Sequence, residues 1–79
     1  MVAKLIVHTS DDAQLTVATH DGNSKTLPTI RREREFSRTA DAGATWPLTV
    51  TAVRLADGLT RTQEVTCTAG KTTDITMTF

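Results

Sequence analysis

The chain has 79 residues, 38% of them hydrophobic, and its nine basic and nine acidic residues give a formal net charge of zero. This length predicts a single domain, residues 1–79, near the lower limit at which one hydrophobic core suffices. A zero net charge excludes a global field that would draw the chain to nucleic acid or to an anionic membrane surface. Because Trp46, Phe36 and Phe79 are its only aromatic residues, a roomy buried active site is hard to build, and we expect no enzyme activity.

The single cysteine, Cys67, excludes an internal disulfide. Its inward place in a predicted strand favours a small buried hydrophobic residue over a reactive thiol. No apolar run approaches the roughly 20 residues of a membrane-spanning helix, and the segment Met1 to Leu5 lacks the apolar region of a signal peptide. We therefore expect no membrane insertion. Abundant threonine suits exposed strands and is typical of secreted or cell-surface proteins, but the localisation is otherwise undetermined.

The first two predicted strands alternate between apolar and polar residues. The first, Val2 to Thr9, and the second, Ala13 to Thr19, are separated by the turn-forming run Ser10-Asp11-Asp12. Each strand places three apolar side chains on one face: Ala3, Leu5 and Val7 in the first, and Ala13, Leu15 and Val17 in the second. We expect the two strands to form a hairpin.

The middle of the chain is more polar and predicts sheet edges. After the turn His20-Asp21-Gly22-Asn23, the segment Ser24 to Thr29 contains Pro28, which cannot donate to a ladder of hydrogen bonds. This segment is predicted as an edge strand or a loop. The charged run Arg31 to Arg38 predicts a short solvated edge strand that only Phe36 anchors to the core, its charges protecting the edge.

The last third of the chain predicts a hairpin around Asp57-Gly58. Two alternating runs, 46–55 and 60–69, flank this dipeptide, which is the strongest short-range hairpin signal. If Asp57 and Gly58 are the two central residues of the turn, six side chains share one buried face, with Val50 opposite Val65, Leu48 opposite Cys67 and Trp46 opposite Ala69. The final strand, Thr72 to Phe79, either pairs with the run 60–69 or crosses to another sheet.

Together these elements predict an all-β fold. Six or seven short strands, turn signals about every ten residues and no helical period favour a small antiparallel β-sandwich of immunoglobulin-like or regulatory-like topology. The small-residue segment Thr39 to Thr45 would then cross the end of the sandwich. A small β-barrel is the alternative.

A series of motifs runs through nearly the whole chain: Ala3-Lys4-Leu5-Ile6-Val7, Asp12-Ala13-Gln14-Leu15-Thr16-Val17, Arg34-Glu35-Phe36-Ser37, Leu48-Thr49-Val50-Thr51-Ala52, Asp57-Gly58, Val65-Thr66-Cys67-Thr68-Ala69-Gly70 and the closing Phe79. Their order resembles a short domain that recurs in planctomycete proteins and has no established function. The alternating strands with Asp-Gly and Ala-Gly turns are also similar to carboxypeptidase regulatory-like and PEGA-type sandwich modules. Because copies of the planctomycete domain usually lie within larger proteins, the resemblance implies a noncatalytic accessory domain.

The chain departs from this pattern at three places. The residues Ala18-Thr19-His20 precede Asp21-Gly22 where the family tends to turn directly after its second strand. Cys67 and Trp46 stand where an aliphatic residue and a tyrosine are expected. The departures bear on the shape of the loops, and the resemblance assigns no catalytic or ligand-binding residue.

The residues that could form a metal site are His8, Asp11, Asp12, His20 and Asp21. In the predicted hairpin, His8 lies beside the turn, whereas His20 and Asp21 lie at the far end of the second strand, about 20 Å away. One ion cannot bridge the two groups, and each alone offers too few ligands. We expect no metal and no other cofactor.

Arginines of the hairpin are candidates for contact with a partner. The two-residue turn would place Arg54 opposite Arg61, and two like charges at one cross-strand position could receive an acidic partner. In the alternative, both side chains extend into solvent near Asp57 or Glu64.

The remaining candidates for partner contact are Arg32, Arg34 and Trp46. The two arginines lie in the charge run, where Glu33 and Glu35 cancel much of the field, so we do not expect nucleic-acid binding. Trp46 is either the largest residue of the core or a platform on which a sugar stacks. The sequence thus favours a protein partner or a neighbouring domain of the same polypeptide, with carbohydrate binding as the alternative.

Overall fold

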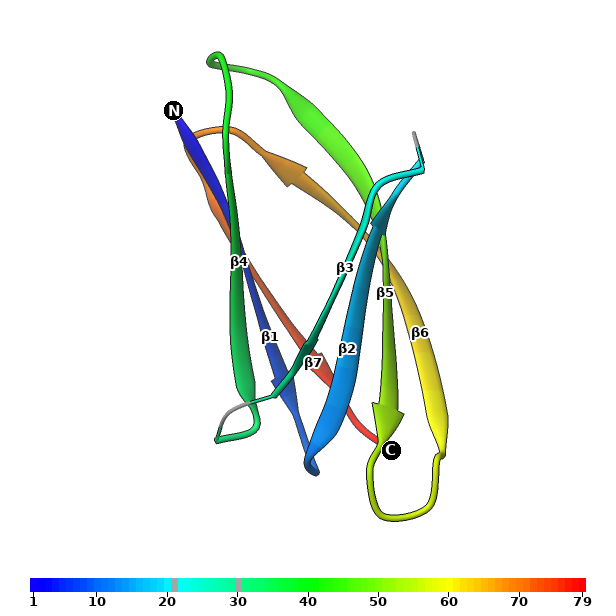
Figure 1. The fold of residues 1–79 in the computed structure, drawn as a ribbon. Helices are drawn as coiled ribbons and strands as arrows, with labels where there is room; N and C mark the ends of the chain where they lie inside the picture. Colours follow the sequence, from blue (N-terminus) through cyan, green and yellow to red (C-terminus); the bar gives the residue numbers. More distant parts are fainter. Residues whose placement is uncertain (21, 30) are drawn as a thin grey trace.

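The computed structural model describes residues 1–20, 22–29 and 31–79 and confirms the predicted β-sandwich. The described residues form seven strands and no helix. The strands are β1 (Val2–Thr9), β2 (Ala13–Thr19), β3 (Ser24–Pro28), β4 (Glu33–Thr39), β5 (Thr45–Arg54), β6 (Thr60–Thr68) and β7 (Thr72–Met77). One sheet has the order β4-β1-β7 and the other has the order β3-β2-β5-β6 (Figure 1).

Period-two alternation determines the core. The first two strands alternate between buried and more exposed positions, as predicted. Their apolar faces pack against each other across the sandwich, because neither sheet can bury an apolar face alone. The core residues are Ala3, Leu5, Val7, Ala13, Leu15, Val17, Val50, Ala52, Cys67, Ile75 and Met77, with Phe36, Trp46, Leu48, Val65 and Phe79 packed around them.

The predicted hairpin between the first two strands is wrong, because β1 and β2 lie in different sheets. The turn at Ser10–Asp12 carries the chain across the sandwich. There, Ser10 N donates to Met77 O at 3.1 Å, and Leu55 N donates to Asp12 O at 3.0 Å. A hairpin would place both apolar faces on one side of a single sheet, whereas this crossing lets each face bury the other.

The last strand changes sheet, which resolves the alternative left open by the sequence. β7 pairs with β1 in parallel, with Ile75 beside Val7, and the other strand pairs of the described chain are antiparallel. The change of sheet occurs at Gly70, whose φ of 85° is a left-handed conformation that glycine adopts without strain. Gly70 N donates to Val2 O at 2.9 Å and so ties this turn to β1.

The β5–β6 hairpin exists, but its predicted register is wrong by two places. Leu48 lies opposite Val65 and Trp46 opposite Cys67. The turn is a four-residue loop, 55–58, closed by Arg54 N donating to Leu59 O at 2.8 Å. Because a shift of two residues preserves the side-chain parity, the predicted apolar face is nevertheless the buried one.

The segments predicted as edges are edge strands. β3 is the outer strand of one sheet and β4 is the outer strand of the other. Between them, Arg31 and Arg32 have φ values of 56° and 61°, in the left-handed region that side chains with a Cβ rarely adopt. This turn therefore stores backbone strain.

The strain at this turn predicts that glycine has opposite effects on stability in the turn and in the neighbouring strand. Arg31→Gly is expected to raise the free energy of unfolding by up to about 1 kcal/mol, because a left-handed residue with a Cβ costs about that much. Arg34→Gly, inside β4, is expected to lower it by roughly 0.5–1 kcal/mol. Urea denaturation of the two variants measures both values, and equal destabilisation by both would contradict the conformation of the turn.

Candidate functional site

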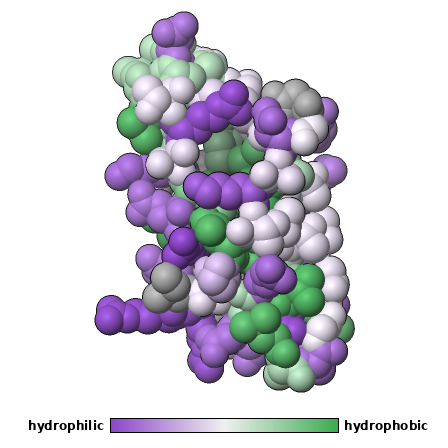
Figure 2. Space-filling view, in the orientation of Figure 1, coloured by the Kyte–Doolittle hydropathy of each residue, from purple (hydrophilic) through white to green (hydrophobic). Residues whose placement is uncertain are grey.

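A groove opens between β3 and β4, the edge strands of opposite sheets, which pair with each other in neither sheet. It encloses a cavity of about 210 Å³. Its lining residues are Ala3, Leu5, Val17, Thr19, Asn23, Ser24, Lys25, Phe36, Ser37, Arg38, Trp46, Leu48 and Cys67. Figure 2 shows a hollow with a hydrophobic floor on this face, bordered by hydrophilic side chains.

The floor of the groove is the core of the sandwich. Leu5, Val17 and Cys67 are buried, and the neighbouring Phe36 and Trp46 are only partly buried. Native interiors leave few voids larger than a water molecule. A cavity of this volume therefore means that part of the apolar surface of the core is left uncovered by the chain itself.

The walls of the groove are the edges of the two strands. Ser24 and Lys25 are consecutive residues of β3, and Phe36, Ser37 and Arg38 are consecutive in β4. Because successive side chains of a strand point to opposite faces, a consecutive run lines a cavity only along the strand edge. Edge strands carry unpaired N–H and C=O groups, so backbone hydrogen-bonding groups border the groove on both sides.

Positive charge is gathered on the groove side of these strands. Arg34, Phe36 and Arg38 pair with the buried residues of β1 and so share the inner face of β4. Lys25 pairs with Val17 and lies on the inner face of β3. The lining residues include no carboxylate, and no ion pair of these three cations is found within the described ranges.

Trp46 lines the groove and packs against the core. The Arg38 guanidinium carbon lies 4.9 Å from the centre of its ring, within the range of a cation–π contact. A second, smaller cavity of about 170 Å³ borders Trp46 together with Thr19, His20 and Pro47. Of the residues predicted to contact a partner, Trp46 lines the groove and Arg34 lies on the inner face of the strand that bounds it.

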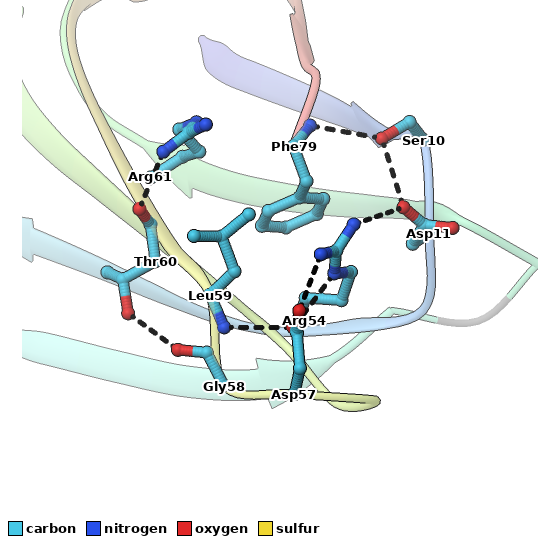
Figure 3. A network of polar contacts seen from close by, with 9 residues as sticks. All are labelled: Ser10, Asp11, Arg54, Asp57, Gly58, Leu59, Thr60, Arg61 and Phe79. Atoms are coloured by element: carbon cyan, nitrogen blue, oxygen red, sulfur yellow. Dashed lines mark hydrogen bonds and ion pairs between the residues drawn. The ribbon is translucent and has the colours of Figure 1, made fainter.

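The guanidinium of Arg54 is bound by other side chains of the same chain (Figure 3). Its guanidinium donates to both carboxylate oxygens of Asp57, at 2.9 and 2.6 Å, and to Asp11 at 3.4 Å, and it lies 5.6 Å from the centre of the Phe79 ring. The predicted pairing of Arg54 with Arg61 is wrong because the four-residue loop places Arg61 opposite Ala52. Arg61 Nη1 donates to Thr60 O at 3.4 Å, on the strand edge away from the groove.

The bond to Arg54 lowers the pKa of Asp57 from 3.8 to about 2. A depressed folded-state pKa contributes stability that is present above pH 3.8 and lost as the pH falls towards 2. We therefore expect Asp57→Asn to flatten the acid side of the stability curve in this window. Guanidinium denaturation at several pH values measures the slope, with Asp41→Asn as the control that keeps it. An unchanged slope in Asp57→Asn would contradict this role of the pair.

The fourth predicted arginine, Arg32, lies at the β3–β4 turn, where its Nε is 3.9 Å from Asp12 Oδ1. Both side chains are more than half exposed, so this ion pair contributes little stability. Arg32 is not a lining residue of the groove.

The residues considered for a metal site do not converge. His8 Nδ1 lies 3.3 Å from Glu33 Oε2, and its Nε2 lies 3.4 Å from Asp74 Oδ1. Each ring nitrogen therefore faces a different carboxylate. No group of three His, Cys, Asp or Glu residues that could hold a metal ion is found in the described part of the chain. Asp21, also considered for a metal, lies outside the described residues.

Cys67 is buried, as its predicted inward position requires. Burial raises the pKa of its thiol, and a hydrogen bond with Thr73 acts in the opposite direction. A raised pKa keeps the sulfur in its unreactive thiol form at neutral pH. The cysteine therefore serves as part of the apolar floor of the groove.

Sequence reasoning anticipated that an exposed sheet edge could receive a partner strand, but it missed Lys25 and Arg38 as parts of a site. A signal for Arg38 was present, since Arg34, Phe36 and Arg38 are spaced two apart and must share a face if residues 33–39 are a strand. For Lys25, the signal appears only once β3 is known to pair with β2. Both edges were predicted, but their placement on the same side of the sandwich depends on the sheet order, which no local motif carries.

Comparisons of the chain with protein-family models, with curated proteins and with solved structures find no significant match. The resemblance to the planctomycete domain stays a prediction. None of the described residues belongs to a helix that is long and apolar enough to cross a membrane.

Proposed function

We propose that this chain is a noncatalytic protein-interaction module, an accessory domain of a larger protein, that binds an extended polypeptide segment in the groove between β3 and β4. The observation that carries this proposal is the unclosed side of the sandwich, where two strand edges flank an apolar cavity. The segment comes from a protein partner or from a neighbouring domain of the same polypeptide.

Strand addition uses both features of the groove. The backbone of an added strand bonds to the unpaired groups of an edge, and its alternate side chains enter pockets beneath. Here β4 pairs with β1 along one edge and is the outer strand of its sheet, so its other edge faces the groove. The cavity lies beneath the inner face of that edge. One extended segment can therefore satisfy the edge and cover the exposed floor.

The test is a titration of the isotope-labelled domain with an extended nine-residue peptide that alternates threonine and valine. Amide signals of β3 and β4 and the indole signal of Trp46 are expected to shift, because these groups border the groove. Size-exclusion chromatography checks that neither the peptide nor its complex with the domain self-associates. Shifts confined to the edges of β6 and β7, or no shifts at all, would refute this site.

Carbohydrate binding through Trp46 is the alternative. The smaller cavity beside Trp46 and His20 favours it, but the Arg38 guanidinium lies over the ring on which a sugar would stack. Trp46 fluorescence measured against a panel of glycans separates the two functions. A saturable response to a glycan would support the alternative, and the peptide proposal expects none.

A further inference from the structure

We infer that the groove selects an acidic segment, one that pairs with the edge of β4 and places the pattern acidic–x–apolar–x–acidic opposite Arg34, Phe36 and Arg38. This inference rests on the proposed strand addition and specifies the chemistry of the partner.

The first argument is the separation of charges by the strand itself. In sequence, Glu33 and Glu35 alternate with Arg34 and would cancel its field. In the structure, Glu33 and Glu35 pair with His8 and Ile6 of β1 and so face outward, whereas Arg34 pairs with buried Val7 and faces inward. The groove side of β4 is therefore cationic although the strand as a whole is nearly neutral.

The second argument is the lack of partners for these cations. Elsewhere, Lys4, Arg32 and Arg54 each face a carboxylate within 4 Å. Arg31, Arg61 and Lys71 face none in the described part of the chain, but they lie outside β3 and β4. Lys25, Arg34 and Arg38 have no such pair in the described part of the chain, and Arg38 lies over Trp46 instead. Arg34 is partly buried, whereas Lys25 and Arg38 are exposed beside the apolar floor. A bound segment that covers this floor would lower the local dielectric constant and so strengthen the attraction between these cations and its carboxylates.

The third argument is the spacing. Side chains two apart on an added strand lie on one face about 6.6–6.8 Å apart. A residue opposite Phe36 enters the cavity, and the residues two places before and after it meet Arg34 and Arg38 as direct cross-strand pairs. Lys25, on the facing wall, adds to the same field. An acyl anion could match the charge and the apolar floor, but it would leave the backbone of the β4 edge unpaired.

The experiment uses capped seven-residue peptides titrated into the whole labelled chain. The matching peptide is Thr-Glu-Thr-Val-Thr-Glu-Thr, and a basic version replaces both glutamates by lysine. A phase control of identical composition, Glu-Thr-Thr-Val-Thr-Thr-Glu, places the carboxylates on the opposite face. The matching peptide is expected to bind roughly tenfold more tightly than either control, from two cross-strand ion pairs.

Variants identify the residues responsible. Arg34→Gln combined with Arg38→Gln is expected to remove the preference for the matching peptide. Arg31→Gln combined with Arg61→Gln changes the net charge equally and is expected to keep it, because Arg31 lies in the turn before β4 and Arg61 lies on β6, at the opposite edge of the sheet from β3. Dispersion of the amide spectrum reports whether each variant is folded. Lys25→Gln provides a variant outside β4 and is expected to weaken the preference by a smaller factor.

The outcomes separate the two proposals. Equal affinity for all three peptides would overturn the acidic specificity and leave strand addition standing. Tighter binding of dodecanoate than of every peptide would replace the polypeptide by an acyl anion. If no peptide shifts the signals of β3 and β4, the proposed function itself fails.

Discussion

Leu15→Ala is expected to unfold most of the protein at room temperature. Leu15 lies in the middle of β2, is 0% exposed and stands between Leu27 of β3 and Ala52 of β5. Truncating a fully buried leucine costs about 2–5 kcal/mol. A single core in a chain of this length rarely supplies more than about 3–5 kcal/mol of net stability. The cost of this one substitution is therefore comparable to the whole free energy of unfolding.

Circular dichroism during urea denaturation measures this loss. The matched control is Leu55→Ala, which makes the same chemical change at a side chain that is 63% exposed in the β5–β6 loop. It is expected to change the free energy of unfolding by less than about 0.5 kcal/mol. If Leu15→Ala and Leu55→Ala unfolded at the same urea concentration, the sandwich core described here would be wrong.

The strands of this fold were predictable because burial imposes a local signal with a period of two. The predicted bounds of the first two strands, Val2 to Thr9 and Ala13 to Thr19, are those of β1 and β2. Their predicted apolar faces are the buried ones. Alternation needs only neighbouring residues, so a single sequence contains it.

Strand pairing was less predictable because it depends on residues far apart in sequence. The short turn after β1 suggested a hairpin, but β1 pairs with β4 and β7. Similarly, Asp57-Gly58 is compatible with loops of different lengths. Asp57 Oδ1 accepts a hydrogen bond from Leu59 N at 3.1 Å, and this bond belongs to the four-residue loop that shifts the register.

The groove was only partly predictable for the same reason. Trp46 was singled out because a lone tryptophan in a small domain must either fill the core or serve a surface function, and it packs against the core at the groove. The cationic wall follows from the alternation of residues 33–38, but its importance depends on β3 and β4 being edges on the same side of the sandwich. That placement is a property of the whole fold.

Ala3→Leu is expected to close the groove and stabilise the protein at the same time. Ala3 is buried at the floor of the cavity, opposite Arg38, so a larger side chain there enters empty space. Cavity-filling substitutions commonly add about 0.5–2 kcal/mol to the free energy of unfolding. The same side chain would occupy the volume that a partner's apolar residue needs, so binding of the threonine–valine peptide is expected to be lost.

Ala52→Leu provides the matched control. Ala52 is 0% exposed and does not line the groove, so the added atoms meet a filled core and are expected to cost about 1–3 kcal/mol. Provided that the variant remains folded, its groove stays open and it still binds the peptide. Urea denaturation and peptide titration of both variants should therefore give opposite changes in stability and in binding. If Ala3→Leu and Ala52→Leu lowered the free energy of unfolding equally, there would be no groove at Ala3 to fill. If the Ala3→Leu variant were more stable but still bound the peptide, the partner would have to bind at another edge.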